Sequence, residues 1–199
     1  MVLKAESSEN RSSLTYIVQN IVVKSSLALN HPLDLNLLSS KLKNSQYNSD
    51  RFPGLFERVK HPKCVIIIFK NGNLVLTGLK SAENLDLTIQ KLIQKIKEVF
   101  PSHLEHESFT FEIVNIVITA DLNQEINLDK AALQLDNIIY EPEVFPGVIF
   151  KRSIPVKSVF LIFSTGKIVL TGIRDEKIIE PVLISLGRLL KTENLFKKS

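Results

Sequence analysis

Several features that would assign this chain to a class of protein are missing from its sequence. One cysteine, Cys64, stands among 199 residues, which excludes an internal disulfide framework and favours a reducing compartment. Seven glycines and eight prolines are too few for a collagen-like or low-complexity chain. No stretch approaches the roughly 20 apolar residues that a membrane helix needs. Residues 1–13 have no apolar core of a secretory signal and predict a short polar tail.

Motifs that carry catalysis are missing as well. The sequence has no glycine-rich phosphate loop, no nucleophile elbow and no supported pair of acids. Cys64 has no histidine nearby in sequence, which argues against a catalytic thiol. His103-Leu104-Glu105-His106-Glu107 contains metal-binding residue types, but no cysteine accompanies them, and a linker is the simpler interpretation. We therefore expect no enzyme, no metal site and no cofactor.

The residues that are present describe a globular protein. Hydrophobic residues make up 44% of the chain and charged residues 23%, so a core can form. The formal net charge is +4, which permits a polyanionic partner without requiring one.

The most informative feature is an internal repeat. Residues 47–78 align with residues 140–172, so that Phe52-Pro53-Gly54 matches Phe145-Pro146-Gly147 and Val75-Leu76-Thr77-Gly78 matches Val169-Leu170-Thr171-Gly172. Upstream, Asn20 matches Asn115. This many matches in register indicate a tandem duplication, with a first repeat over residues 14–100, a linker over 101–108 and a second repeat over 109–199.

Each repeat predicts the element order β-α-β-β-β-α. The strands follow β-branched and apolar runs at residues 14–23, 56–59, 65–69, 74–77, 109–120, 148–151, 159–163 and 168–171. Short helices are expected at 34–44, with Asp34 as N-cap, and at 128–137. Long helices are expected over 81–99 and 176–191, with Pro181 near the start of the second.

The strands at 65–69 and 159–163 are apolar on both faces. A solvated sheet face should show a polar residue at every second position, and these strands show none. Each repeat has too few helices to cover both faces, so one face should stay open. Such a patch usually marks a binding surface, although a homodimer contact or a terminal segment could also cover it.

Asn20 and Asn115 stand at matched positions in the middle of strands, where asparagine is disfavoured. Each shares its face with aliphatic residues. Two related amides suit a pseudo-symmetric ligand such as the minor groove of an A·T-rich duplex, which presents acceptors on both strands. The alternative is a structural asparagine that is satisfied by neighbouring backbone.

These residues resemble the TATA-binding protein family over about residues 14–190. The motifs that carry the resemblance are Gln19-Asn20-Ile21-Val22, Tyr47-Asn48, Arg51-Phe52, Lys80-Ser81, Tyr140-Glu141-Pro142-Glu143, Phe145-Pro146-Gly147, Leu161-Ile162-Phe163 and residues 166–172. The resemblance implies an α+β fold in which two tandem pseudo-symmetric repeats form a saddle-shaped, curved antiparallel sheet with helices on the convex side.

The resemblance also implies roles for individual residues. Four phenylalanines would wedge between base steps: Phe52, Phe69, Phe145 and Phe163. The groove floor would consist of Asn20, Val22, Ile67, Val75, Thr77, Asn115, Val117, Leu161, Val169 and Thr171. Phosphates would be met by Arg51, Arg58, Lys80, Lys151, Lys167 and Arg174. Kinking of the duplex by apolar wedges is a known mode of minor-groove binders, this family among them.

One turn tests this assignment. Phe69 and Val75 share a face only if the loop between their strands has an odd number of residues. Asn71-Gly72 alone would favour a two-residue type I′ turn. The matched Thr165-Gly166 lacks that signal, so we expect a three-residue loop, residues 71–73, with Gly72 or Asn73 at positive φ.

The sequence departs from the family pattern at several positions. Asn73 stands where the family usually has a lysine, which only Lys167 keeps in the second repeat. Pro53-Gly54 replaces two small residues, and Val114 replaces a glutamine. These departures bear on strict TATA preference and on the contact with transcription factor IIA.

As a member of this family, the chain would be a general initiation factor that binds and kinks A·T-rich promoter DNA and nucleates the preinitiation complex. Its partners would be transcription factor IIB, through Glu141, Glu143 and Val144, then transcription factor IIA and the associated factors. The alternatives are a diverged scaffold with weak DNA specificity and, from another class, an accessory domain of a nuclease or glycosylase, where the repeat occurs once. The basic charge favours a nucleus over an archaeal cytoplasm.

Overall fold

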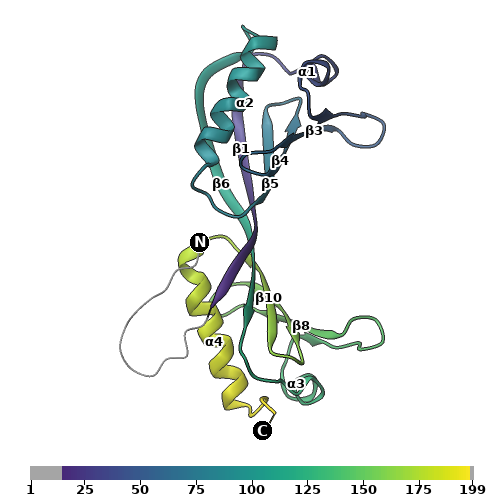
Figure 1. The fold of residues 1–199 in the computed structure, drawn as a ribbon, viewed down its shortest axis with the longest axis vertical. Helices are drawn as coiled ribbons and strands as arrows, with labels where there is room; N and C mark the ends of the chain where they lie inside the picture. Colours follow the sequence, from purple (N-terminus) through teal and green to yellow (C-terminus); the bar gives the residue numbers. More distant parts are fainter. Residues whose placement is uncertain (1–14, 198–199) are drawn as a thin grey trace. The chain divides into compact units, whose positions relative to one another are not determined.

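The computed structural model describes residues 15–197, apart from the side chains of residues 105–108. The predicted polar tail, residues 1–13, lies outside the described residues. The chain divides into two compact units, each containing antiparallel strands of one ten-stranded sheet and one long helix (Figure 1). Of the described residues, the first unit comprises 20–114, and the second comprises 115–197 with 15–19.

The first unit is an antiparallel sheet with two helices. Along the chain its elements are β1 (Tyr16–Leu29, which begins in the second unit), α1 (Leu35–Lys41), β2 (Ser45–Gln46), β3 (Gly54–Val59), β4 (Cys64–Phe69), β5 (Asn73–Leu79) and α2 (Leu85–Val99). Its strands lie in the order β2-β3-β4-β5-β1.

The second unit repeats this arrangement. Its elements are β6 (Leu104–Asp121, which begins in the first unit), α3 (Leu128–Gln134), β7 (Ile138–Ile139), β8 (Gly147–Arg152), β9 (Ser158–Phe163), β10 (Lys167–Ile173), the 3₁₀ turn η1 (Glu176–Ile178) and α4 (Ile179–Thr192). Its strands lie in the order β6-β10-β9-β8-β7. The predicted α+β class with two tandem repeats is therefore confirmed.

No helix in residues 15–197 combines the length and apolarity needed to cross a membrane.

The helices form where local signals place them. The carboxylate of Asp34 accepts hydrogen bonds from the backbone N–H groups of Asn36 and Leu37, which confirms it as the N-cap of α1. Asn127 caps α3 in the same way through the N–H of Lys130. Pro181 is the third residue of α4, in the first turn, where no intrahelical N–H is needed.

In each unit the sheet is buried on one face only. Along β4, Cys64, Ile66 and Ile68 are buried, whereas the residues between them are half-exposed. β9 has the same alternation. The apolar residues of α2 and α4 supply the rest of each core, as the 3.6-residue spacing predicted. The half-exposed side of the sheet in each unit is called the open face of that unit below.

The hairpin between β4 and β5 has the predicted odd loop, one residue earlier than expected. Ile67 pairs with Val75 and Ile68 with Leu74, which leaves Lys70, Asn71 and Gly72 as the loop. Gly72 has φ +84° and its N–H bonds to the carbonyl of Phe69. The β9–β10 hairpin is built in the same way, with Gly166 at φ +87°.

Several boundaries differ from the sequence prediction. β1 continues to Leu29, beyond the predicted end at Val23, because buried residues recur at Val23, Ser25 and Leu27. β6 begins at Leu104, inside the predicted joint and before Phe109. Both short helices end three residues early, since the backbone after Lys41 and after Gln134 turns extended.

Candidate nucleic-acid interface

Two phenylalanine pairs lie on the open faces, one in each unit. The ring centroids of Phe52 and Phe69 are 6.0 Å apart, and those of Phe145 and Phe163 are 5.6 Å apart. Gly54 lies opposite Phe69 in the β3–β4 ladder, as Gly147 lies opposite Phe163 in the β8–β9 ladder. The four predicted wedge residues thus occupy matched places.

The two glycines make room for these rings. A Cβ atom added to Gly54 would lie 2.7 Å from Cε1 of Phe52 and 2.8 Å from Cγ2 of Ile67. At Gly147 it would lie 2.9 Å from the carbonyl oxygen of Ile162 and 3.0 Å from Cε1 of Phe145. Glycine therefore follows from close packing here, and the Phe-Pro-Gly motif is one structural device used twice.

The ten predicted groove-floor residues are all half-exposed, as one open face per unit requires. The aliphatic members stand on adjacent strands, for example Ile67 directly opposite Val75 and Leu161 directly opposite Val169. The full set is Asn20, Val22, Ile67, Val75, Thr77, Asn115, Val117, Leu161, Val169 and Thr171. An apolar surface of this kind on a sheet is typical of a binding face.

Asn20 and Asn115 hold a β-bulge in place. The register between β1 and β5 shifts next to Gly78, and the register between β6 and β10 shifts next to Gly172; both glycines have φ +89°. Oδ1 of Asn20 accepts the Gly78 N–H at 2.7 Å, and Oδ1 of Asn115 accepts the Gly172 N–H at 2.8 Å. The hydroxyls of Thr77 and Thr171 lie 3.4 and 3.2 Å from the same oxygens.

Both interpretations of these asparagines therefore have support. The backbone contact is the structural role. Nδ2 of Asn20 also donates to the Thr77 hydroxyl at 3.3 Å, a contact that uses one of its two N–H groups. Gly78 and Gly172 lie near the ends of β5 and β10. They are bulge residues, and glycine adopts their left-handed φ without steric cost.

The six predicted phosphate-binding side chains are all exposed. Arg58 pairs across the ladder with Val65, and Lys151 with Val159, so these two cations lie on the open faces. Lys167 begins β10, whereas the matched first-unit position is Asn73. Arg51, Lys80 and Arg174 follow or precede strands.

The predicted partner loop is an exposed turn before Phe145. The carbonyl of Glu141 accepts the N–H groups of Val144 and Phe145, both at 2.9 Å. Glu141 and Glu143 are exposed and Val144 is 80% exposed. In the first unit the carbonyl of Asn48 accepts the matching pair of N–H groups. The two turns share their backbone and differ in charge.

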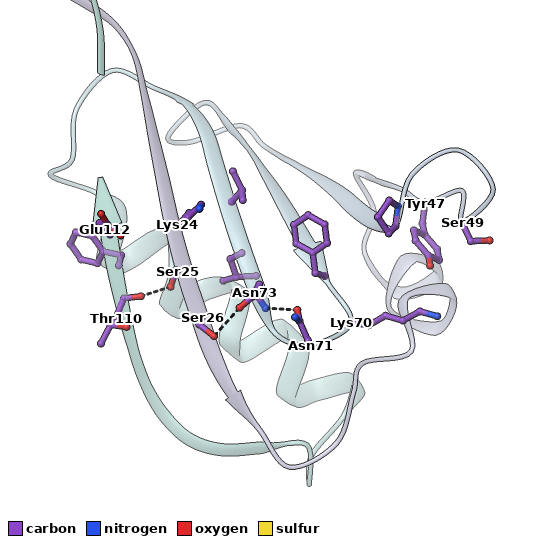
Figure 2. A pocket seen from close by; sticks show the side chains of 15 residues that line it. Lys24, Ser25, Ser26, Tyr47, Ser49, Lys70, Asn71, Asn73, Thr110 and Glu112 are labelled. Atoms are coloured by element: carbon purple, nitrogen blue, oxygen red, sulfur yellow. Dashed lines mark hydrogen bonds between the residues drawn. The ribbon is translucent and has the colours of Figure 1, made fainter. Parts of the chain in front are cut away.

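Lys24 and Ser26 were missed by sequence reasoning. They continue the open-face row of Val18, Asn20 and Val22 along β1, and they are exposed. Together with Asn73 and Phe69 they line a hollow of about 990 Å³ in the first unit (Figure 2). The period-2 alternation past Val23 was the signal that would have placed them.

Comparison with known proteins decides the family. The family model described as "Transcription factor TFIID (or TATA-binding protein, TBP)" matches residues 15–99 and 110–192. The chain belongs to the TATA-binding protein family.

Individual members of the TATA-binding protein family match over most of their length. The TATA-box-binding protein of Aeropyrum pernix is 39% identical over 175 residues, which cover 87% of this chain and 83% of the relative. That of Sulfolobus acidocaldarius is 40% identical over 159 residues, covering 80% and 78%. The solved structure of Methanococcus jannaschii TBP superposes with a TM-score of 0.75 at 36% identity, covering 90% of this chain and 98% of that one.

The TATA-binding protein family consists of DNA-binding transcription initiation factors with a repeat architecture, and it is non-enzymatic. These relatives are archaeal, whereas a nucleus was predicted from the sequence. Cys64 is buried at the start of β4, and burial raises the pKa of its thiol to about 11, so it is no thiolate at neutral pH. The side chains of Glu105, His106 and Glu107 lie outside the described residues.

Proposed function

We propose that the chain binds A·T-rich promoter DNA through the minor groove, kinks it and nucleates assembly of the initiation complex. The observation that carries this proposal is the open face of each unit. It is apolar and half-exposed, and in both units it has the same asparagine and the same phenylalanine pair. The sugar-lined floor of a minor groove is a ligand that an apolar sheet face can cover.

The phenylalanine pairs support kinking. Each pair packs over a glycine that leaves space for its rings, so the two rings of a pair already lie together without DNA. Apolar side chains that enter a base step unstack it at a cost of a few kcal/mol, which the enlarged contact offsets. Phe52 and Phe69 would act at one step, and Phe145 and Phe163 at another.

Polar groups would set register and part of the specificity. The Nδ2 groups of Asn20 and Asn115 are donors that suit the acceptors of A·T pairs in the minor groove. The exposed cations Arg51, Arg58, Lys80, Lys151, Lys167 and Arg174 would meet phosphates and supply affinity that depends on salt and not on sequence.

We further propose an archaeal, cytoplasmic setting, as the named relatives support. Glu141, Glu143 and Val144 form an exposed acidic turn that suits docking of transcription factor IIB. Transcription factor IIA and the associated factors are further partners that the family resemblance suggests. The domain limits 14–100 and 109–199 enclose the two segments that the family model matches.

Binding to three duplexes with end labels for energy transfer tests the proposal. The duplexes have the same length and an A·T, an inosine·cytosine or a G·C core. Inosine·cytosine keeps the minor-groove acceptors of A·T but changes the major groove, so we expect it to be bound and bent like A·T. Phe163→Ala should reduce the bend. Equal loss of binding on inosine·cytosine and G·C would refute minor-groove recognition, and failure on all three would favour the scaffold alternative.

A further inference from the structure

Lys24 is a cation in a row of otherwise uncharged side chains on the open face of β1. It follows Asn20 and Val22 on the open face of β1, and its direct cross-strand partner on β5 is Val75. The side chain is exposed and makes no ion pair with any residue that the structure describes. A lysine on this face is unexpected if the row only covers a groove floor.

The second unit shows what has changed. The residue that matches Lys24 is Thr119, which pairs with Val169 in the same register. The residue that matches Asn73 is Lys167, which lies opposite Asp121, as Asn73 lies opposite Ser26. Each unit therefore has one lysine at two diagonal cross-strand positions, on β1 in the first unit and on β10 in the second.

The surroundings of Lys24 indicate how it can act in place of a lysine at position 73. Figure 2 shows Lys24, Ser26 and Asn73 lining the same hollow of about 990 Å³. Ser26 Oγ donates to Oδ1 of Asn73 at 3.2 Å, and the Asn73 N–H donates to Asn71 at 3.2 Å, so Asn73 is held among neutral partners. Diagonal neighbours on adjacent strands stand roughly 7–8 Å apart, a separation that a four-carbon lysine stem can bridge.

We propose that Lys24 is the phosphate-binding lysine of the first unit's open face, in the role that Lys167 would have in the second. This inference rests on the proposed function and adds a binding residue to it. Because the cation has moved from β5 to β1, the two units grip the DNA backbone at places that are not related by the repeat. The protein itself would then distinguish the two ends of its site.

The test is the salt dependence of DNA affinity for four variants, measured between 50 and 200 mM salt on one A·T-rich duplex. Each phosphate contact contributes about 0.9 to the slope of log K against log salt concentration. We expect Lys24→Thr to make the slope less steep by about 0.9, and Lys24→Thr with Asn73→Lys to restore it. Lys167→Thr should lose about 0.9 as well. Lys91→Thr, on the exposed side of α2, is the matched control and should leave the slope unchanged.

Each outcome decides a separate point. In the first outcome, wild-type protein binds, Lys24→Thr has the wild-type slope, and Lys167→Thr has a less steep slope. Lys24 is then no phosphate ligand, and the proposed function stands. If Lys91→Thr loses as much as Lys24→Thr, the effect is one of net charge and the inference fails. If wild-type protein does not bind, the proposed function itself is wrong. Lys24 is exposed, so an unchanged melting temperature should accompany its replacement.

Discussion

Beneath its sheet, the first unit has a buried carboxylate that is paired with a lysine. The matching place in the second unit has a phenylalanine and a leucine. Glu57 on β3 is 2% exposed, and its Oε1 lies 3.0 Å from Nζ of Lys95 on α2. The matching residues are Phe150 and Leu189, which line one hollow of the second unit. The Arg152 guanidinium lies 5.9 Å from the centroid of the Phe150 ring.

The difference shows that a buried position tolerates either chemistry when both partners change together. An ion pair under a sheet loses hydration that its attraction only partly repays, so an apolar pair of similar size is about as stable or more so. A buried charge that has lost its partner destabilises the fold much more than either the intact ion pair or the apolar pair does. The second carboxylate oxygen of Glu57 already has no hydrogen-bond partner among the described residues, so Lys95 is its main compensation.

The largest effect should come from separating that pair. Lys95→Leu introduces the second unit's residue into the first and leaves Glu57 buried without its cation. We expect a loss of about 3 kcal/mol in the free energy of unfolding, at the lower end for buried pairs because Lys95 is half-exposed. Adding Glu57→Phe should recover at least half of it. Urea unfolding followed by circular dichroism measures both, and a double variant no more stable than the single one would contradict the comparison.

A smaller effect is expected from changes in the exposed turns that precede Phe52 and Phe145. Glu141→Arg with Glu143→Arg should weaken docking of transcription factor IIB on the protein–DNA complex by at least ~2 kcal/mol, because charges are reversed at a close polar contact. Affinity for DNA alone should stay nearly unchanged, with a modest gain from added positive charge. The matched control is Asn48→Arg with Asp50→Arg in the first unit's turn. Gel-shift titration gives the result, and equal losses in both variants would show that the turns are not distinguished.

The smallest expected effect separates the two glycines. Gly147→Ala brings Cβ to 2.9 Å from a backbone oxygen, which cannot move cheaply, so we expect about 2 kcal/mol of destabilisation. Gly54→Ala meets only side chains, and Phe52 is 37% exposed and able to turn away. It should cost less than about 1 kcal/mol in stability while reducing the bend in DNA. Similar melting temperatures for the two variants would mean that Ile162 and its strand yield as easily as a side chain.

Much of the fold was predictable because the two sequence repeats carry the same motifs in the same order. The alignment of Phe52-Pro53-Gly54 with Phe145-Pro146-Gly147 fixed matched strands, and Asp34 fixed the start of a helix. The odd hairpin loop followed from requiring Phe69 and Val75 on one face, and the second copy resolved the misleading Asn71-Gly72 signal. Period-2 and period-3.6 patterns then separated the buried face from the open one.

The other features of the fold and of the site depend on how strands and helices pair in space, which no local sequence pattern predicts. The bulge at Gly78 exists because β1 and β5 differ by one residue in register, and only the ladder shows it. No sequence pattern around Glu57 indicates that its side chain is buried and paired with Lys95 of α2. Lys24 lies past the predicted end of β1 at Val23, although the buried face continues through Ser25 and Leu27.

The bulge also limits what the two asparagines can offer a ligand. A primary amide can usually rotate by 180° and exchange its donor for its acceptor. Here the N–H of Gly78 or Gly172 occupies Oδ1, and rotation would set two donors against each other. The outward group is therefore always an N–H donor. A G·C pair at this point presents its own amine donor to the groove, so it would be rejected by an unrelieved clash of donors. Exclusion of this kind does not rely on attraction between charges, and it should persist at salt concentrations that weaken every phosphate contact.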